Sequence, residues 1–372
     1  MRGVAILGST GSIGRSTLEV LRRQREHFRV VGLTARRNEE LLRAQAAEWR
    51  PPYVGMVDGE ATGNGIRRGT ACLVEAATLA DADIVVNAVV GAAGLEATLA
   101  ALRAGKRVAL ANKETLVMAG DLVTRAAREG GGELVPVDSE HSAVLQCISG
   151  RESPMCRLIL TASGGPFRDW PADRMARATL EEALRHPTWR MGRKITVDSA
   201  TLANKALEVI EAHHLFGLPY EAIEVVVHPQ SIIHAFTEFC DGSVIAQLGF
   251  PSMELPILYA LTHPDRLPDE GVRRFDPVAA GSLTFEPVRA DVFRAFGAGL
   301  EAARAGGTAP AVFNAANEEA VAGFLAGRIP FGRIMETIDR VLTEHDVRPV
   351  SGLEDVVAAD AWARTSARKV LS

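Results

Sequence analysis

The chain has 372 residues, more than one ordinary hydrophobic core accommodates, which indicates two or three domains. It carries 41 Lys and Arg against 46 Asp and Glu, for a net charge of -5, so it has no basic excess to neutralise a nucleic-acid backbone. No charged-then-apolar leader precedes the first predicted strand, and no apolar run approaches the roughly 18 residues of a membrane span. The sequence therefore predicts a cytoplasmic protein without a nucleic-acid or membrane partner.

Four cysteines are spread along the chain without a recognisable spacing. Cys72, Cys147, Cys156 and Cys240 make no C-x-x-C pair and no zinc-binding pattern. We expect buried free thiols in a reducing compartment and assign them no chemistry.

Strand and helix patterns alternate from the N-terminus onward. An apolar strand, a glycine turn, a helix and a second strand form a βαβ unit at residues 3–8, 9–14, 15–28 and 29–35. Two further strand candidates and the helical segment between them lie at 83–89, 106–112 and 95–105. Because such strands join through right-handed crossovers, we predict a Rossmann-like parallel-sheet domain over residues 1–125.

The glycine turn "GSTGSIG" places glycines at positions 8, 11 and 14, a looser spacing than the standard dinucleotide fingerprint. It follows the first strand directly and opens a helix, whose free N–H groups and dipole favour a pyrophosphate. We expect the dinucleotide to be cradled by Thr10, Gly11, Ser12 and Ile13.

The end of the second strand bears on the choice of cofactor. An NAD enzyme would normally place an acid there for the ribose hydroxyls, whereas this chain offers Arg36, Arg37 and Asn38. Guanidinium groups suit a 2′-phosphate, so the pattern favours NADPH. The alternative is a solvated strand end.

A third polar group follows the strand at 106–112. Asn112, Lys113 and Glu114 stand at the carboxyl end of this strand, the sheet edge where ligands bind and where a nicotinamide ring would lie. Lys113 is either an ordinary solvated lysine or the cation that a substrate oxygen or phosphate requires.

The pattern changes after the glycines near residue 130. Strands, a helix and an Asp-Gly hairpin are predicted at 157–163, 194–200, 223–228, 202–216 and 231–250. Further helices are predicted at 290–305, 311–327 and 332–345. The predicted fold class is α/β, with the Rossmann-like domain followed by an α+β catalytic domain over 126–265, a linker over 266–290 and a small helical bundle over 291–372.

Acidic residues in two segments raise the question of a metal. Asp138 and Glu140 end the short strand of "VPVDSEHSA", where i and i+2 side chains share one side, unless they are simply a solvated strand end. Glu208 shares a helix face with Asn204 and Lys205, which is otherwise the wet side of an amphipathic helix. Three carboxylates with open positions describe a Mg²⁺ or Mn²⁺ site.

Two clusters remain. Ser163, Gly164 and Gly165 form a turn that can direct N–H groups and a hydroxyl at an anion, or an ordinary glycine turn. The aperiodic segment 184–194, with His186 and Trp189, has the composition of a lid. The alternative is a loop anchored by Trp189 in the core.

Taken together, these segments resemble 1-deoxy-D-xylulose 5-phosphate reductoisomerases over essentially the whole chain. The shared motifs are "ILGSTGSIG", "ANKE", "VDSEHSA", "TASGGPFR", "HPTWRMGRKITVDSATLANKALEVIEAH", "VVVHPQSIIHAF", "DGSVIAQLG" and "PAVFNAANEEAVAGFL". The resemblance implies NADPH-dependent conversion of 1-deoxy-D-xylulose 5-phosphate to 2-C-methyl-D-erythritol 4-phosphate, one divalent cation per subunit, and a homodimer with the hairpin sheet near its interface.

The resemblance also implies roles for single residues. The metal ligands would be Asp138, Glu140 and Glu208, which with Lys113 form the catalytic set. The substrate contacts would be Lys113, Ser139, Glu140, Ser163, His186, Ser199, Asn204, Lys205 and Glu208. Further cofactor contacts are expected at Asn112, Glu114 and Gly192.

Two segments depart from the family pattern. The family often has Gly-Lys-Asn at residues 36–38 and Asn-Trp-Ser at 188–190, where this chain has Arg-Arg-Asn and Thr-Trp-Arg.

Two other functions fit part of the sequence. A metal-independent sugar or semialdehyde dehydrogenase leaves the three acids unexplained, and an NADPH-binding sensor without catalysis needs no such set of acids and anion ligands.

Overall fold

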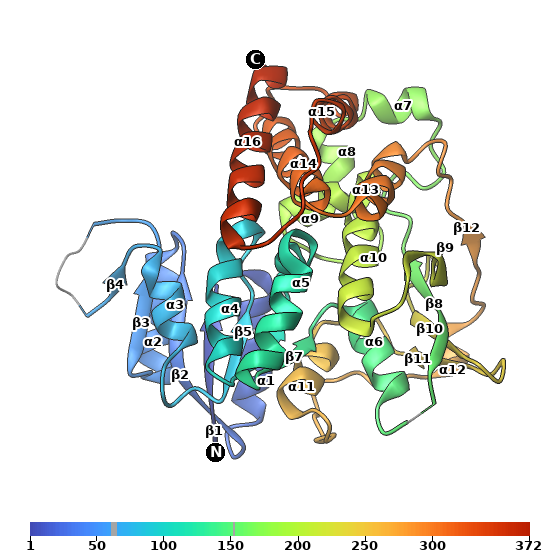
Figure 1. The fold of residues 1–372 in the computed structure, drawn as a ribbon. Helices are drawn as coiled ribbons and strands as arrows, with labels where there is room; N and C mark the ends of the chain where they lie inside the picture. The colour runs from blue at the N-terminus through green and yellow to red at the C-terminus, as the bar shows by residue number, and fades with distance from the viewer. Residues whose placement is uncertain (61–64, 152) are drawn as a thin grey trace. The chain divides into compact units, whose positions relative to one another are not determined.

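A computed structural model describes residues 1–60, 65–151 and 153–372 (Figure 1). The chain divides into two compact units. The first consists of Met1–Thr115, Asp121–Ser149 and Ser252–Arg274, and the second of Leu116–Gly120, Gly150–Pro251 and Phe275–Ser372. The finer division into three domains and a linker stays a prediction.

A seven-stranded parallel sheet forms the centre of the first unit, in the order β4-β3-β2-β1-β5-β6-β7. Its strands are β1 (Arg2–Leu7), β2 (Phe28–Ala35), β3 (Tyr53–Met56), β4 (Arg67–Arg68), β5 (Ile84–Asn87), β6 (Arg107–Leu110) and β7 (Glu133–Pro136). The Rossmann-like sheet predicted from the alternating pattern is confirmed.

Seven α-helices and a short 3₁₀ turn connect these strands or pack on them. They are α1 (Ser12–Arg23), α2 (Glu39–Trp49), α3 (Ala71–Ala77), η1 (Gly91–Gly94), α4 (Leu95–Arg103), α5 (Lys113–Gly130), α6 (Ser139–Ile148) and α11 (Glu254–Thr262). Helix α5 leaves helical geometry at Ala119, and its residues 116–120 group with the second unit.

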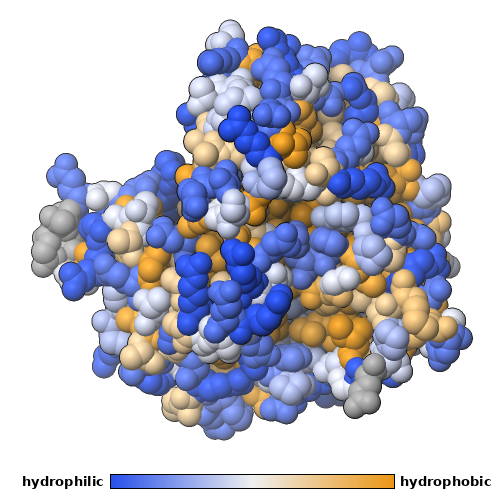
Figure 2. Space-filling view, in the orientation of Figure 1, coloured by the Kyte–Doolittle hydropathy of each residue, from blue (hydrophilic) through white to orange (hydrophobic). Residues whose placement is uncertain are grey.

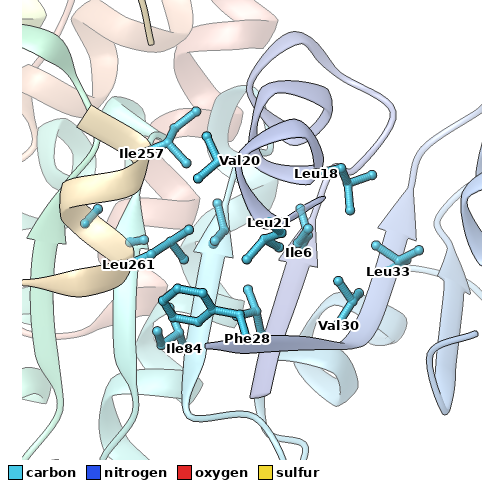
Figure 3. Close-up of a cluster of buried hydrophobic side chains, with 14 of the residues drawn as sticks. Ile6, Leu18, Val20, Leu21, Phe28, Val30, Leu33, Ile84, Ile257 and Leu261 are labelled. Carbon is cyan, nitrogen blue, oxygen red and sulfur yellow. The ribbon is translucent and has the colours of Figure 1, made fainter. Parts of the chain in front are cut away.

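A large cluster of buried apolar side chains in the first unit covers one face of this sheet (Figure 3). Alternate residues of β1 point to that face, where Ile6 packs in one cluster with Leu21 of α1 and with Ile257 and Leu261 of α11. Each is at most 1% exposed, and burying such a side chain stabilises the fold by about 1.5–3 kcal/mol. The 3.6-residue spacing of apolar positions in α1 thus fixes how this helix, which follows the glycine turn, packs on the sheet.

A mixed five-stranded sheet belongs to the second unit, in the order β11-β10-β8-β9-β12. Its strands are β8 (Met155–Ala162), β9 (Ile223–Val227), β10 (Ile233–Phe239), β11 (Val244–Leu248) and β12 (Glu286–Pro287). Strands β8 and β9 are parallel, and the other neighbours are antiparallel. The predicted Asp-Gly hairpin is confirmed as β10 and β11.

The rest of the second unit is helical. Its elements are α7 (Ala172–Ala176), α8 (Leu180–Leu184), α9 (Arg193–Thr201), α10 (Ala203–Phe216), η2 (Tyr220–Ala222), α12 (Pro277–Ala280), α13 (Arg294–Ala305), α14 (Ala309–Leu325), α15 (Gly332–Thr343) and α16 (Leu353–Leu371). The three predicted C-terminal helices are confirmed as α13, α14 and α15, and α16 adds a fourth.

The strand predicted at 194–200 is wrong, because this segment is helix α9. Three consecutive β-branched residues, Ile195, Thr196 and Val197, favour a strand locally. The segment nevertheless packs on α10 and α14 and buries every residue from Thr196 to Thr201. Tertiary packing therefore overrides local propensity here.

The expectation of four buried free thiols is also wrong in part. Cys72 and Cys147 are free and buried, but Cys156 and Cys240 form a disulfide with Cα atoms 5.4 Å apart. Antiparallel pairing of β8 with β10 sets Arg157 opposite Glu238, which brings both cysteines to one end of the ladder. Their separation of 84 residues hides this pairing in the sequence.

The visible surface is mostly hydrophilic and is interrupted by apolar areas (Figure 2). Among the described residues, no helix is both long enough and apolar enough to cross a membrane.

Candidate functional site

The glycine turn after β1 is held by main-chain contacts. The N–H groups of Gly8 and Ser9 both donate to the carbonyl of Thr34, at 3.1 and 2.8 Å. Gly8 has a φ of +85°, and a side chain at Gly14 would place its Cβ 2.3 Å from the carbonyl oxygen of Gly8. Only glycine fits this turn without strain, which explains the sequence motif.

The turn leaves the start of α1 open. Gly11 is the N-cap, it makes no side-chain capping bond, and both Gly11 and Ser12 are exposed. The first N–H groups of a helix have no intrahelical partner, so this end of α1 can accept an anionic ligand. Thr10 and Ile13 lie beside it and are partly buried.

Two buried hydrogen bonds that the sequence did not predict also hold this turn. Gln45 of α2 accepts a hydrogen bond from the Ser9 hydroxyl at 2.7 Å, and its amide donates to the Ser9 carbonyl at 3.0 Å. Ser9 is fully buried and Gln45 is 6% exposed. The spacing between them gives no sequence signal, since the contact depends on how α2 packs.

Arg36 and Arg37 are exposed at the carboxyl end of β2, as predicted, and Asn38 caps α2 by accepting from the N–H of Leu41. Both guanidinium groups contact the Asp58 carboxylate, Arg37 at 2.8 Å and Arg36 at 3.4 Å. The hydrogen bond from Arg37 lowers the pKa of Asp58. Asp58, which the sequence analysis did not identify, is thus a shared ion-pair partner that holds the two guanidinium groups close together.

The residues after β6 are buried. Asn112 donates to the carbonyls of Val89 and Gly91 at 2.8 and 2.9 Å and to the Glu114 carboxylate at 3.2 Å. Asn112 therefore fixes the loop after β5. Lys113, at the start of α5, forms an ion pair of 2.6 Å with Asp138 and is only 6% exposed. A solvated Lys113 is excluded.

Asp138 and Glu140 do not share a strand, contrary to the prediction. Strand β7 ends at Pro136, Asp138 is the N-cap of α6, and Glu140 lies in the first helical turn. A carboxylate oxygen of Asp138 is still within 4.8 Å of one of Glu140, because a helix start also brings such positions together. Ser139 donates to Glu140, and a ring nitrogen of His141, which the sequence did not single out, lies within 4.8 Å of Asp138.

The polar face of α10 is buried, so a wet amphipathic helix is the wrong description. Lys205 is 4% exposed and Glu208 is 2% exposed. The Lys205 ammonium donates to the Thr161 carbonyl at 2.6 Å and to Glu208, whose other carboxylate oxygen accepts from Asn204. Buried charges require such partners, so this arrangement is specific.

Ser163 and His186 meet in the second unit, with Ser163 Oγ 3.0 Å from His186 Nε2. The Nδ1 atom of His186 accepts from the N–H groups of Thr188 and Trp189, so the ring proton is on Nε2 and is donated to Ser163. Burial lowers the pKa of His186 to about 4, so the ring is neutral at pH 7. The Ser163 hydroxyl can then donate its own proton to a ligand.

The Ser163 turn lies against α9. Gly164 and Gly165 have φ values of +82° and +67°, and a Cβ on Gly165 would lie 2.6 Å from the carbonyl oxygen of Ser199. Ser199 is inside α9, not at a cap, and Gly192 is the N-cap of that helix. Ser163 and Ser199, both predicted substrate contacts, therefore lie on neighbouring segments.

Residues 185–192, between α8 and α9, contain no helix or strand. The Trp189 ring is partly buried, with its centroid 6.2 Å from that of His234. The lid and the anchored loop both stay predictions.

The comparisons cover the whole chain. Residues 4–120 match the family model described as 1-deoxy-D-xylulose 5-phosphate reductoisomerase, and residues 134–216 and 248–366 match models of the C-terminal domains of that enzyme. A protein of that name from Geobacillus kaustophilus is 51% identical over 100% of both chains. Another, from Geobacter sp. strain M21, is 50% identical over 100% of this chain and 99% of its own.

Solved structures agree with this result. The reductoisomerase from Zymomonas mobilis in complex with NADPH has a TM-score of 0.92 and 42% identity, covering 100% of this chain and 99% of its own. A DOX-P reductoisomerase in complex with NADPH, fosmidomycin and magnesium has a TM-score of 0.93 and 40% identity, covering 100% and 98%. The chain therefore belongs to the 1-deoxy-D-xylulose 5-phosphate reductoisomerase family.

Proposed function

We propose that this protein converts 1-deoxy-D-xylulose 5-phosphate to 2-C-methyl-D-erythritol 4-phosphate, using NADPH and a divalent cation, Mg²⁺ or Mn²⁺. The observation that carries the proposal is the polar set at the end of β8, in which Lys205, Glu208 and Ser199 are buried and Ser163 and His186 are partly buried. There Lys205 and Glu208 of α10 lie in the same unit as Ser163, His186 and Ser199. This set offers donors for a phosphate and a carboxylate for a metal, a combination that a metal-independent dehydrogenase does not require.

The phosphate of the substrate would bind to Ser163, Ser199, Asn204 and Lys205. The Ser163 hydroxyl already receives hydrogen bonds from His186 and from the N–H of Gly165, so its remaining proton is directed outward. The Lys205 ammonium supplies charge in a buried environment, where its interaction with an anion is stronger than in water. Binding energy gained on this non-reacting group would orient the reacting carbons.

The cofactor would bind along the first unit. The open start of α1 suits the pyrophosphate, with Thr10, Gly11, Ser12 and Ile13 as the cradle. Arg36 and Arg37 suit the 2′-phosphate, since both guanidinium groups are exposed and converge on Asp58. Asn112, Glu114 and Gly192 stay predicted cofactor contacts.

The carboxylates Asp138, Glu140 and Glu208 would hold the cation. Their chemistry fits, because hard divalent ions prefer carboxylate oxygens. Asp138 and Glu208 each contact a lysine ammonium, Lys113 and Lys205, so each carboxylate already neutralises a positive charge. When bound, the cation supplies Lewis-acid polarisation of the substrate oxygens and NADPH supplies the hydride.

The chain's own residues would do the rest. Lys113, held by Asp138 at 2.6 Å, would offset negative charge that develops on the substrate oxygens. His186 is neutral and donates from Nε2, so at the substrate it would orient the Ser163 hydroxyl without adding charge. Ser139 would contact the substrate beside Glu140, to which it donates.

The deciding experiment measures NADPH oxidation with 1-deoxy-D-xylulose 5-phosphate, before and after chelation. We expect turnover that the chelator abolishes and that Mg²⁺ or Mn²⁺ restores. Turnover that persists in chelator favours a metal-independent dehydrogenase, and NADPH binding without turnover favours a sensor.

We also propose a homodimer formed near the hairpin sheet. Strand β11 is at one edge of the five-stranded sheet, and Val244 at its start is 50% exposed, so the edge can accept a second chain. Analytical ultracentrifugation would test this, with Val244→Lys expected to shift the protein toward monomer.

The cytoplasmic location stays a prediction. The Cys156–Cys240 disulfide gives it no support, because disulfides are rare in reducing compartments.

A further inference from the structure

Helix α9 contains a buried carboxylate that the proposed mechanism does not use. Asp198 is 1% exposed. One of its carboxylate oxygens accepts from the Asn317 amide at 2.8 Å, and the other lies 3.0 Å from the Lys194 ammonium. Asn317 belongs to α14, which packs on α9 (Figure 1), so a residue of the C-terminal helices contacts the helix that carries Ser199.

Because of its position in α9, Asp198 can affect where Ser199 lies. Asp198 directly precedes Ser199, whose carbonyl lies against Gly165 of the Ser163 turn. Lys194 is one helical turn earlier, where the segment 184–194 ends. Any rotation of α9 about its axis would therefore move Ser199 relative to Ser163.

The "NAANEE" motif of α14 provides an internal comparison. Asn314 and Asn317 are both fully buried. Asn314 donates to Glu318 of its own helix at 3.2 Å, whereas Asn317 donates to a carboxylate on another element. Burying an amide is costly, and a hydrogen bond to a charged acceptor is stronger and more directional than packing of an apolar side chain.

We propose that Asn317 is a positioning residue for the phosphate end of the substrate site. By holding Asp198 it fixes α9, and so keeps Ser199 beside the Ser163 turn. This inference rests on the proposed function, because it assigns the Ser163 and Ser199 segments to the substrate phosphate. It gives the C-terminal helices a part in substrate binding although they contribute none of the residues assigned to the substrate.

The test compares Asn317→Leu with Asn314→Leu, two substitutions of equal chemistry on one helix. Both should lower Tm. Only N317L should raise the KM for 1-deoxy-D-xylulose 5-phosphate, by roughly 10-fold or more for a lost bond to a charged group, with the KM for NADPH within about twofold of wild type. The paired exchange Asp198→Asn with Asn317→Asp reverses donor and acceptor. Its KM for the substrate should be closer to that of the wild type than the raised KM of Asn317→Asp alone.

Equal KM values for N317L and N314L, or a paired exchange no better than Asn317→Asp alone, would overturn the inference. Hydrogen exchange of the α9 amides gives a readout that needs no turnover. It should be faster in N317L than in N314L at residues 196–200, and equal rates would also count against it. Absence of turnover by the wild type would instead refute the proposed function, and the exchange comparison would still decide whether Asn317 holds α9.

Discussion

The glycine turn of the first unit and the α9–α10 segment of the second unit, the two proposed anion sites, would bind an anion by different groups. The turn offers main-chain N–H groups at the open start of α1, and its shape follows from Gly8 and Gly14 within one short motif. The α9–α10 segment offers side chains, and their positions depend on Thr161 and Asn317 far along the chain. A site of main-chain groups is local in sequence, whereas a site of buried side chains depends on the whole unit.

The largest effect should come from Glu208. Replacing Glu208 by Gln keeps the size of the side chain but removes a charge, and if Glu208 is a metal ligand, as proposed, its loss should reduce turnover at least about 100-fold. NADPH binding, measured by fluorescence titration, should be retained, since the first unit is unchanged. Lys205 keeps its bond to Thr161, so the fold should persist.

Glu224→Gln is the matched control for this prediction. Glu224 of β9 pairs with Arg157 at 3.0 Å on the surface of the same unit. Its loss should leave turnover within about twofold, because exposed ion pairs contribute about 0–1 kcal/mol. Full activity of E208Q in the presence of chelator would refute the assignment of Glu208 to the metal.

Gly165 tests the close approach of the Ser163 turn to helix α9 at Ser199. Gly165→Ala should destabilise the fold by about 1–2 kcal/mol for its left-handed backbone and about 1–3 kcal/mol more for the contact with the Ser199 carbonyl. Gly217→Ala should have the same cost for a left-handed backbone, because Gly217 has a φ of +68°. A Cβ at Gly217, however, has no atom within 4 Å, so this variant lacks the second cost. Urea unfolding and substrate KM of both variants separate the two terms. Equal losses would show that Ser163 and Ser199 do not depend on this contact.

These two regions also differ in how far sequence could predict them. The βαβ pattern gives the first unit's sheet and turn, because periodicity and glycine spacing act over a few residues. The strand predicted at 194–200 failed because its β-branched residues are buried by α10 and α14, which local propensity does not register. The same limit hid Gln45, Asp58 and the Cys156–Cys240 pair, whose partners are fixed only by packing.

The arginines at the end of β2 test the proposed cofactor site in the first unit. Arg36→Asp with Arg37→Ala should weaken NADPH binding by about 10-fold to 100-fold, since charge-assisted hydrogen bonds contribute about 1.5–3 kcal/mol. NADH binding should change little, because NADH lacks the 2′-phosphate. Dissociation constants for both cofactors provide the measurement. An unchanged preference for NADPH would mean that other residues select the cofactor.

Gln45 tests whether the glycine turn is as local as its motif suggests. Gln45→Leu removes two hydrogen bonds to Ser9, and should raise the KM for NADPH by roughly fivefold for each kcal/mol of turn stabilisation lost, with kcat nearly unchanged. Gln24 is the matched control: it is also 6% exposed and in the first unit, but its amide donates to the Pro268 carbonyl. Gln24→Leu should lower Tm without changing that KM. If both variants behave alike, Gln45 is only a packing residue.

The smallest effect should appear in the pH dependence of stability, to which the His186 ring contributes one component. Burial lowers the pKa of His186 from about 6.5 to about 4, so between these values the unfolded chain binds a proton that the folded chain does not. The stability that comes from the neutral, hydrogen-bonded ring is therefore complete above about pH 6.5 and declines as the pH falls toward about 4. His186→Asn removes the titrating group, so its free energy of unfolding should fall less steeply across this interval than that of the wild type in urea unfolding. Parallel curves for the two proteins would show that the ring is accessible to protons in the folded state, and the assignment of the His186 Nε2 proton to Ser163 would then lose its basis.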